Sequence, residues 1–225
     1  MSLPDYAPIP KSALGPALNE QGYYVGRVER NLYWITDGVY QSAFLTTRDG
    51  VVLLDAPPTI GRNIQRAVDQ IAAENGVSSK VTHLVYSHHH ADHAGASSLF
   101  DKSVTRIGHE ETRRLLLRDN DPARPAPEET FQDRRTLQVG GERIELTWQG
   151  SNHSPDNIYI HLPDHDTLML IDIGYLDECA DAAAAPVIAK YTGVLAAADV
   201  FTASTTFWVM ESVRLDLGFG SQVHP

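Results

Sequence analysis

The sequence predicts a mixed α/β fold in a single domain, and three observations support this. The chain has 225 residues, enough to bury a sizeable core without disulfide bonds. Runs rich in aromatic and β-branched residues alternate with segments whose apolar residues recur at helical spacing. No internal repeat or linker divides the chain. We therefore expect an extended Pro-rich arm over residues 1–20 and one domain over residues 21–225, of which 199–225 form an atypical tail.

The first half of the chain is predicted to form strands followed by a helix. Strand-like runs, two of them bounded by Asp-Gly turns, occupy residues 23–28, 32–36, 39–46 and 51–55. The last run, VVLLD, is apolar until its final residue, which is typical of a strand buried on both faces. The helix is expected to begin at a Thr59 cap and to end at Asn75-Gly76.

The second half continues the alternation. A short helix is expected over 109–118, and a loop with three prolines over 119–130. An Ala-rich segment, 180–198, is helix-like. The apolar run 207–210 lacks an obvious strand-and-turn context, and we expect it to mark an oligomer or aggregation surface. Further strands are expected at 81–87, 104–107, 143–148, 158–162 and 167–173.

Composition restricts the function. The chain carries 18 Lys and Arg against 29 Asp and Glu, a net charge of −11. This balance argues against nucleic acid and against anionic lipid surfaces as partners. No apolar stretch approaches the roughly 18 residues of a membrane helix. The single cysteine and the absence of a signal-peptide pattern indicate a cytoplasmic protein. A small molecule is the expected partner, and the oligomeric state is left open.

The strongest signal for chemistry is the motif His88-His89-His90-Ala91-Asp92-His93. In an extended segment, alternate residues share a side, so His88, His90 and Asp92 should project together while His89 points away. His93 joins them if the chain turns into a helix there. Nitrogen and oxygen donors without a thiolate are typical of a zinc site. Chance produces this motif in roughly one or two of a thousand such sequences, so a solvated His-rich loop is disfavoured.

The motif is accompanied by Asp55 at the end of VVLLD, a later His in the loop GSNHSPDN, and Asp172 in LMLIDIGY. With these features the chain resembles the metallo-β-lactamase superfamily over about residues 23–175. The resemblance implies a four-layer αββα sandwich of two mixed sheets, with one or two zinc ions, or Fe or Mn, at one edge between the sheets. It also implies a ligand set: His88, His90 and His153 for the first ion, Asp92 and His93 for the second, and Asp172 as the bridge. We interpret Asp55 as a hydrogen-bond acceptor that fixes the motif loop.

The resemblance implies a hydrolase in which a metal-activated hydroxide cleaves an ester, lactone, thioester or β-lactam-type bond. Asp92 would hold a metal and orient the nucleophile. Tyr175, three residues after Asp172, resembles a tyrosine that lies near the substrate carbonyl in lactonases of the superfamily. The HSPDN loop departs from the H-[ST]-P-G-H pattern of lactonases and glyoxalase II-like thioesterases, because Asp156 and Asn157 replace Gly and His.

Two alternatives stay open. RNA-processing nucleases of the superfamily share the motif, although an acidic chain without a Lys/Arg cluster does not favour a phosphodiesterase. A degenerate metal-binding protein is the second alternative. The family's last His follows a Gly, whereas residues 199–225 contain no Gly-His and only His224. We therefore expect an altered or truncated C-terminal end. His161 and His165 are expected to be solvated.

Overall fold

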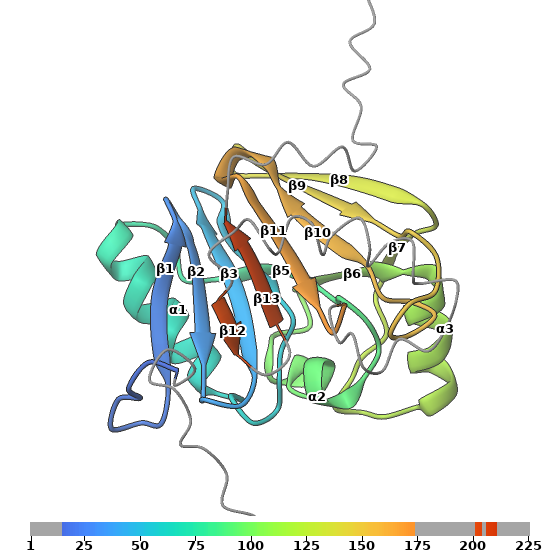
Figure 1. The fold of residues 1–225 in the computed structure, drawn as a ribbon, viewed down its shortest axis with the longest axis horizontal. Coiled ribbons are helices and arrows are strands. Elements are labelled where there is room, and N and C mark those ends of the chain that lie inside the picture. The colour runs from blue at the N-terminus through green and yellow to red at the C-terminus, as the bar shows by residue number, and fades with distance from the viewer. Residues whose placement is uncertain (1–14, 174–200, 204–205, 211–225) are drawn as a thin grey trace, which may run out of the picture.

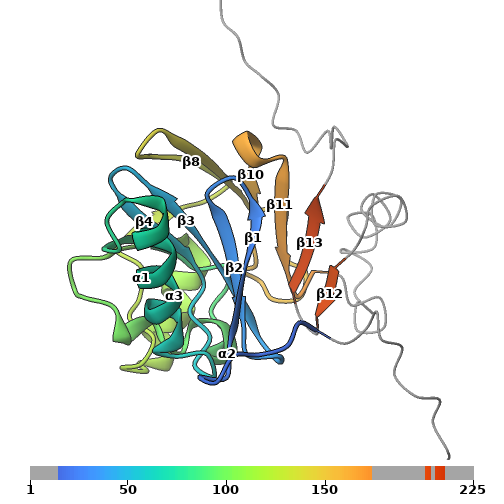
Figure 2. The same ribbon diagram turned by 90° about the vertical axis from the view of Figure 1, so that its left-hand side faces the viewer.

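The computed structural model describes residues 15–173, 201–203 and 206–210. Two sheets pack face to face, and helices cover the outer side of the first sheet (Figures 1 and 2). The mixed α/β prediction is confirmed. The helix-like segment 180–198 and the tail beyond residue 210 lie outside the described residues. Among the described residues, no helix is both long and apolar enough to cross a membrane.

The first sheet has seven strands in the order β1-β2-β3-β4-β5-β6-β7. Its first four strands are antiparallel neighbours, and β4 to β7 run parallel. Because parallel neighbours need crossover connections, helices join them on the outer face. The strands are β1 (Tyr24–Glu29), β2 (Leu32–Thr36), β3 (Gln41–Thr47), β4 (Gly50–Leu54), β5 (Val81–Val85), β6 (Thr105–His109) and β7 (Glu129–Phe131).

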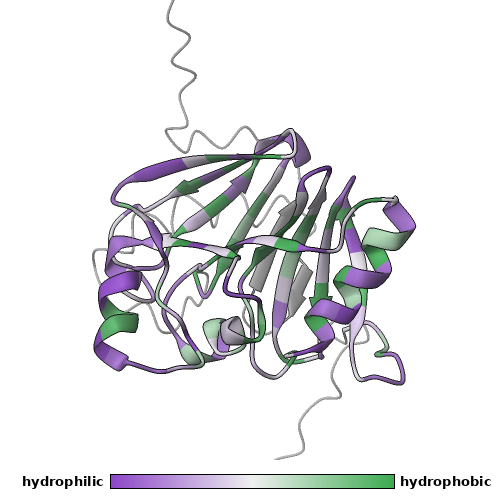
Figure 3. Ribbon diagram, turned by 180° about the vertical axis from the view of Figure 1, so that it is seen from behind, coloured by the Kyte–Doolittle hydropathy of each residue, from purple (hydrophilic) through white to green (hydrophobic). Residues whose placement is uncertain are grey.

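Helix α1 (Asn63–Asn75) joins β4 to β5, α2 (Ala91–Ala94) lies between β5 and β6, and α3 (Glu110–Asp119) joins β6 to β7. Single 3₁₀ turns occupy Ser97–Leu99 and Pro163–His165. Gly76 ends α1 in the left-handed conformation (φ 68°), and its N–H bonds the carbonyls of Ala72 and Ala73. Figure 3 shows hydrophilic colour along the outward surfaces of α1 and α3.

The second sheet is antiparallel, in the order β12-β13-β11-β10-β9-β8. Residues 207–210 lie in β13, which pairs with β11, so the prediction that this run lacks a strand context is wrong. The strands are β8 (Arg134–Val139), β9 (Glu142–Thr147), β10 (Tyr159–Leu162), β11 (Thr167–Ile171), β12 (Phe201–Ala203) and β13 (Thr206–Met210).

Strand β4 explains the apolar run VVLLD. Leu53 belongs to the core between the first sheet and its helices, whereas Val52 and Leu54 belong to the core between the two sheets. All three side chains are fully buried. A central strand with a core on each face must be apolar on each face, which removes the alternation of a half-buried strand. Asp55 directly follows β4 and therefore lies at the edge of the sandwich where the two apolar cores end.

Three local predictions differ from the structure. Residues 129 and 130, predicted to end a loop, lie in β7. Helix α1 begins at Asn63 with Arg62 as its cap, not at Thr59, because residues 57–63 form hydrogen-bonded turns before it. The turns include bonds from Gly61 N to Pro57 O and from Asn63 N to Ile60 O. Strand β8 was not predicted, although its buried Leu137 and Val139 alternate with more exposed residues, which is the period of a strand.

Candidate metal centre

The candidate site lies where three segments end at one edge of the sandwich. The His-rich motif follows β5 and turns into α2. His153 lies in the connection between β9 and β10, and Asp172 comes directly after β11. Asp172 adopts the left-handed conformation (φ 58°), which Asp tolerates better than most residues. The two sheets therefore bring together residues that are up to 84 positions apart, His88 and Asp172.

One group of side chains offers four ligand atoms that all lie within 4.8 Å of one another, from His88, His90, His153 and Asp172. Nε2 of His153 is 3.2 Å from Nδ1 of His90. Oδ2 of Asp172 is 3.6 Å from Nε2 of His88 and 3.4 Å from Nε2 of His153. Three imidazoles and a carboxylate are donors typical of a zinc site, and here they lie close together.

His93 and Asp92 adjoin this group. Helix α2 turns His93 inward, where its Nε2 lies 3.0 Å from Oδ2 of Asp172 and 3.7 Å from Oδ2 of Asp92. His93 is fully buried, while the Asp92 side chain is 44% exposed. The structure thus brings together six of the residues singled out in the sequence. Tyr175 and His224 lie outside the described residues.

Buried atoms without partners show that these residues fit a metal ion. Within the described part of the chain, Nε2 of His88, both ring nitrogens of His93 and Oδ1 of Asp172 have no hydrogen-bond partner. Buried polar atoms are rarely left unpaired, since their desolvation is then uncompensated. A divalent ion requires lone pairs from its ligands, and a neutral imidazole offers one of its two nitrogens for this purpose. The donor set of nitrogen and oxygen suits zinc, and also iron or manganese.

A buried relay sets the tautomer of His88. Asp55, fully buried, accepts hydrogen bonds from the Ser87 backbone N–H (2.8 Å) and the Ser87 hydroxyl (2.6 Å). Because the single hydroxyl proton goes to the Asp55 carboxylate, Ser87 Oγ accepts from Nδ1–H of His88 at 2.9 Å. Nε2 of His88 then carries a lone pair toward the cluster. The contacts of Asp55 agree with its interpretation as the acceptor that holds the motif loop.

Burial and neighbouring charge control protonation in the metal-free cluster. Burial, followed by the charges of His93 and His90, holds the pKa of His88 well below its ordinary value, so its ring is neutral at pH 7. Burial also lowers the pKa of His90. For His93, burial works in the same direction, but Asp172 and Asp55 outweigh it and raise the pKa. A metal ion therefore competes with protons for the ring nitrogen of His93 that faces Asp172, because a ligating imidazole must be neutral.

Replacing Asp55 with Asn tests the electrostatics of this relay in metal-free protein. Burial raises the pKa of Asp55 from its ordinary 3.8 to about 6. The folded state therefore binds more protons than the unfolded state between these values. The contribution of Asp55 to stability is complete below about pH 4 and is lost as the pH rises through about 6. Urea unfolding should show wild type losing free energy relative to Asp55→Asn across this window. Parallel pH profiles would contradict it.

Sequence reasoning missed several residues around the site. The hydroxyl of Tyr40 donates to Oδ2 of Asp92 at 3.1 Å, and its ring meets the His93 ring edge-on at 5.7 Å. Tyr40 precedes β3 in a turn, and no motif marks it. His165 is 2% exposed, with Nε2 2.9 Å from Oδ1 of Asn31, so its predicted solvation is wrong. The inter-sheet contact that buries it is not visible in the local sequence.

Comparison with known proteins decides the family. The family model described as "Metallo-beta-lactamase superfamily" matches residues 35–209. The chain belongs to the metallo-β-lactamase superfamily. Its candidate metal centre is therefore built on the strands and loops that the match includes, and the predicted resemblance is confirmed.

Relatives and solved structures of the superfamily agree with this. The 2,4-dinitroanisole O-demethylase subunit alpha of Nocardioides sp. (strain JS1661) is 26% identical over 149 residues, which are 64% of this chain and 44% of that protein. Metallo-beta-lactamase IND-1 of Chryseobacterium indologenes is 26% identical over 147 residues, 61% of this chain and 59% of that protein. The chain thus spans about half the length of these relatives.

The crystal structure of metallo-beta-lactamase IND-7 superposes with a TM-score of 0.59 at 23% identity, covering 72% of this chain and 77% of that one. A metallo-beta-lactamase from Pontibacter korlensis superposes with a TM-score of 0.53 at 22% identity, covering 63% and 67%. At this level of identity the likeness shows the fold.

Proposed function

We propose that this chain is a metal-dependent hydrolase that cleaves an ester, lactone, thioester or β-lactam-type bond of a small molecule. The observation that carries the proposal is the compact group of His88, His90, His153 and Asp172, whose ligand atoms lie within 4.8 Å of one another. Membership of the metallo-β-lactamase superfamily supports it. Zinc is the proposed metal, as one or two ions. The cytoplasmic location stays a prediction.

The contacts suggest how ligands are shared. His88, His90 and His153 would hold one ion, and Asp92 and His93 would hold a second. Asp172 suits the bridging position because its Oδ2 lies 3.0 Å from Nε2 of His93 and also within 3.6 Å of Nε2 of His88. Bound there, a divalent ion supplies Lewis acidity for the carbonyl and lowers the pKa of water toward neutrality.

Of the six candidate ligands, Asp92 is the one best placed to act on substrate and water. Its side chain is 44% exposed, whereas those of His88 and His93 are fully buried. We assign Asp92 to orient the attacking water and to accept its proton. Ser87 is no competing nucleophile, because it is fully buried and its hydroxyl donates to Asp55. Tyr175 near the substrate carbonyl stays a prediction.

Tyr40→Phe tests the support of Asp92. The substitution removes one hydrogen bond to a carboxylate, an interaction worth about 1.5–3 kcal/mol. We expect kcat/KM to fall by roughly 10- to 100-fold, which is the same energy expressed as a rate. Metal content and melting temperature should stay near wild type, because the phenyl ring preserves the packing. An unchanged kcat/KM would show that Tyr40 does not hold Asp92 during the reaction.

A substrate panel tests the function itself. Zinc-loaded full chain is assayed with a lactone, a thioester, nitrocefin, a phosphodiester and 2,4-dinitroanisole, the last from the name of a relative. Metal content is measured on the same samples by elemental analysis. Turnover of one of the first three with bound zinc supports the proposal. Fewer than about 0.2 metal ions per chain would contradict the proposal of a metal-dependent hydrolase, since the proposed chemistry depends on the ion.

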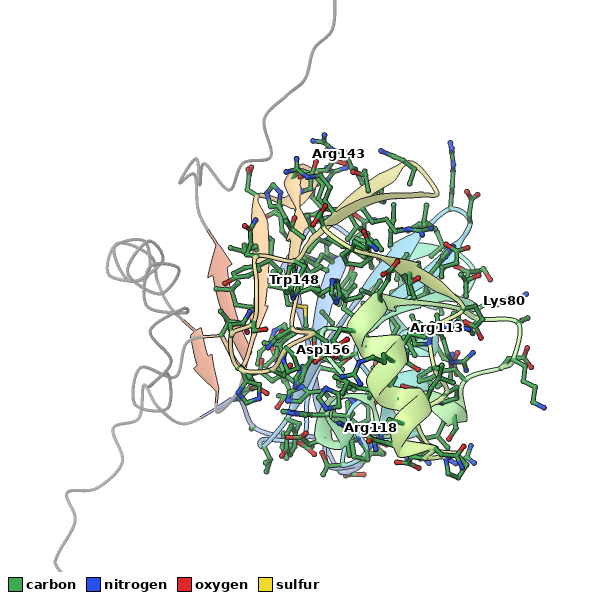
Figure 4. The ribbon with its side chains drawn as sticks, turned by 90° about the vertical axis from the view of Figure 1, so that its right-hand side faces the viewer. Lys80, Arg113, Arg118, Arg143, Trp148 and Asp156 are labelled. Carbon is green, nitrogen blue, oxygen red and sulfur yellow. The ribbon has the colours of Figure 1, made fainter. Side chains whose placement is uncertain are left out.

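The phosphodiesterase alternative finds little support in the arginines of α3 (Figure 4). Arg113 donates to the carbonyl of Pro127, Arg114 pairs with Glu111, and Arg118 pairs with Asp119. Each guanidinium thus has an internal partner in place of a phosphate. Cleavage of the phosphodiester alone in the panel would reverse this preference, and bound metal without turnover of any compound would favour a non-catalytic binder.

A further inference from the structure

We infer that His89 and Asp156 form a positioning pair that holds the ligand segment His88–His90 against the loop carrying His153 and thereby sets the metal affinity of the site. The inference rests on the proposed metal centre. Neither residue belongs to the group of four candidate ligands. The middle histidine of the HHH run would thus serve the site without binding the ion.

The pair joins two loops that are distant in the sequence. Nδ1 of His89 lies 2.9 Å from Oδ1 of Asp156, across 67 positions of the chain. Asp156 is fully buried beside α3 and also accepts the Ser154 hydroxyl at 2.7 Å. Figure 4 shows Asp156 to the left of α3, the helix that carries Arg113 and Arg118. Asp156 comes three residues after His153, so the bond ties the loop of one candidate ligand to the peptide between two others.

Asp156 is a carboxylate at neutral pH. Burial on its own would raise its pKa, but the hydrogen bonds of His89 and Ser154 and the charge of His89 outweigh burial and lower the pKa. A carboxylate only accepts hydrogen bonds, so Nδ1 of His89 is the donor. A bond from a ring N–H to a buried charge is stronger than one between neutral groups. Loss of the His89 donor would leave the buried carboxylate of Asp156 with one hydrogen bond fewer, which is costly for a buried charge.

His89 is held from a second direction as well. Its carbonyl oxygen accepts from Nη1 of Arg124 at 2.6 Å, and Arg124 is paired with Asp121 at 2.8 Å. The side chain and the backbone of one residue are therefore both anchored. The His89 and His90 rings also meet edge-on at 4.6 Å. A rotation at residue 89 would displace the imidazole of His90 and, through the peptide bond, that of His88.

Residues that orient ligands control metal affinity without touching the metal. Loss of such an outer partner commonly costs about 10- to 100-fold in affinity. In most sites the partner bonds the second nitrogen of the ligating imidazole. Here the bond goes to the residue between two ligands, so it orients both through the main chain.

The test compares His89→Leu with His89→Asn in the full chain. Both side chains branch at Cγ, but only Asn offers an N–H at the position of Nδ1 to donate to Asp156. Zinc affinity is measured by competition with a chromophoric chelator, and the Co²⁺ absorption spectrum reports ligand geometry. We expect His89→Leu to lose about tenfold or more in affinity and to alter the Co²⁺ spectrum, and His89→Asn to stay within about threefold of wild type.

Glu145→Gln provides a matched control. It weakens another histidine–carboxylate contact, 3.1 Å between His161 and Glu145, on strands β9 and β10. Its zinc affinity should equal that of wild type. If His89→Leu does not fold by circular dichroism, His89→Ala replaces it with the same expectation.

The outcomes separate the inference from the proposed function. Equal losses in the Leu and Asn variants would reduce His89 to a packing role and overturn the inference. Wild-type affinity in the Leu variant would overturn it as well, while leaving the metal centre intact. A wild-type chain that binds no zinc would instead overturn the proposed function, and the inference with it.

Discussion

Replacement of His90 by Ala is expected to lower hydrolysis by about 1,000-fold or more, because the metal ion contributes several kcal/mol to the barrier. His90 supplies one of the four clustered ligand atoms, and its Nδ1 lies 3.2 Å from Nε2 of His153. The His90 ring is only partly buried, unlike that of His88, so its removal should leave a folded protein. Initial rates and elemental analysis on the same zinc-loaded samples measure the two effects together.

His161→Ala is the matched control for this experiment. His161 is also partly buried, but it lies on β10 beside Glu145 and outside the cluster. Its substitution should leave metal content and rate unchanged. Retention of full activity by His90→Ala would contradict the assignment and would point to a contaminant or to a different site.

Zinc is expected to raise the melting temperature of the metal-free chain by roughly 8–16 °C. Ligand at 1,000 times its dissociation constant stabilises the folded state by about 4 kcal/mol, and each kcal/mol shifts a domain of this size by about 2–4 °C. Buried atoms of His88, His93 and Asp172 that lack a hydrogen-bond partner are the reason to expect so large an effect, since a bound metal ion would coordinate them. Differential scanning calorimetry with and without zinc measures it.

The same calorimetric comparison on His90→Ala should show a much smaller rise of the melting temperature with zinc. Removal of the metal with a chelator should return wild type to its original melting temperature, which excludes irreversible effects. A wild-type shift below about 2 °C at saturating zinc would contradict a metal site built into the fold, because tight binding must appear as stability.

The core of the candidate site was predictable because it is encoded locally. The alternation of His88 and His90 in the extended segment before α2 was predicted, and α2 (Ala91–Ala94) brings His93 to them. Asp92 joins them from the first turn of α2, not by the predicted alternation of an extended chain. His153 and Asp172 followed only from resemblance to a family. Their spacing has no local meaning until β9, β10 and β11 place their ends beside β5.

The supporting residues were not predictable from local pattern. Tyr40 reaches Asp92 across 52 positions, and Asp156 reaches His89 across 67. In the sequence, Tyr40 lies in a predicted strand and Asp156 in a predicted loop, and no motif pairs either with its partner. Asp156 was noted only as a departure from a lactonase pattern, whereas in the structure it is a fully buried hydrogen-bond acceptor. Asp55 was the exception, since a carboxylate at the end of a fully apolar strand must find donors nearby.

Strands β1 to β6 of the first sheet were predicted within a few residues, because the composition of these segments reflects their burial. Continuous apolar residues in β4 reflect a core on each side. The edge strand β7 and the neighbouring β8 were less visible. Strand β7 has three residues with one buried, and the proline-rich segment before it hides its start.

By itself the sequence determined that this protein is a mixed α/β domain with a dense cluster of metal-binding side chains after a buried strand. Periodicity and burial act over a few residues, so both are visible in the chain. The tertiary structure alone decided which distant residues complete and brace the cluster. Those contacts depend on how the face-to-face packing of two sheets brings their strand ends together at one edge of the sandwich, and packing geometry of that kind has no period in the sequence.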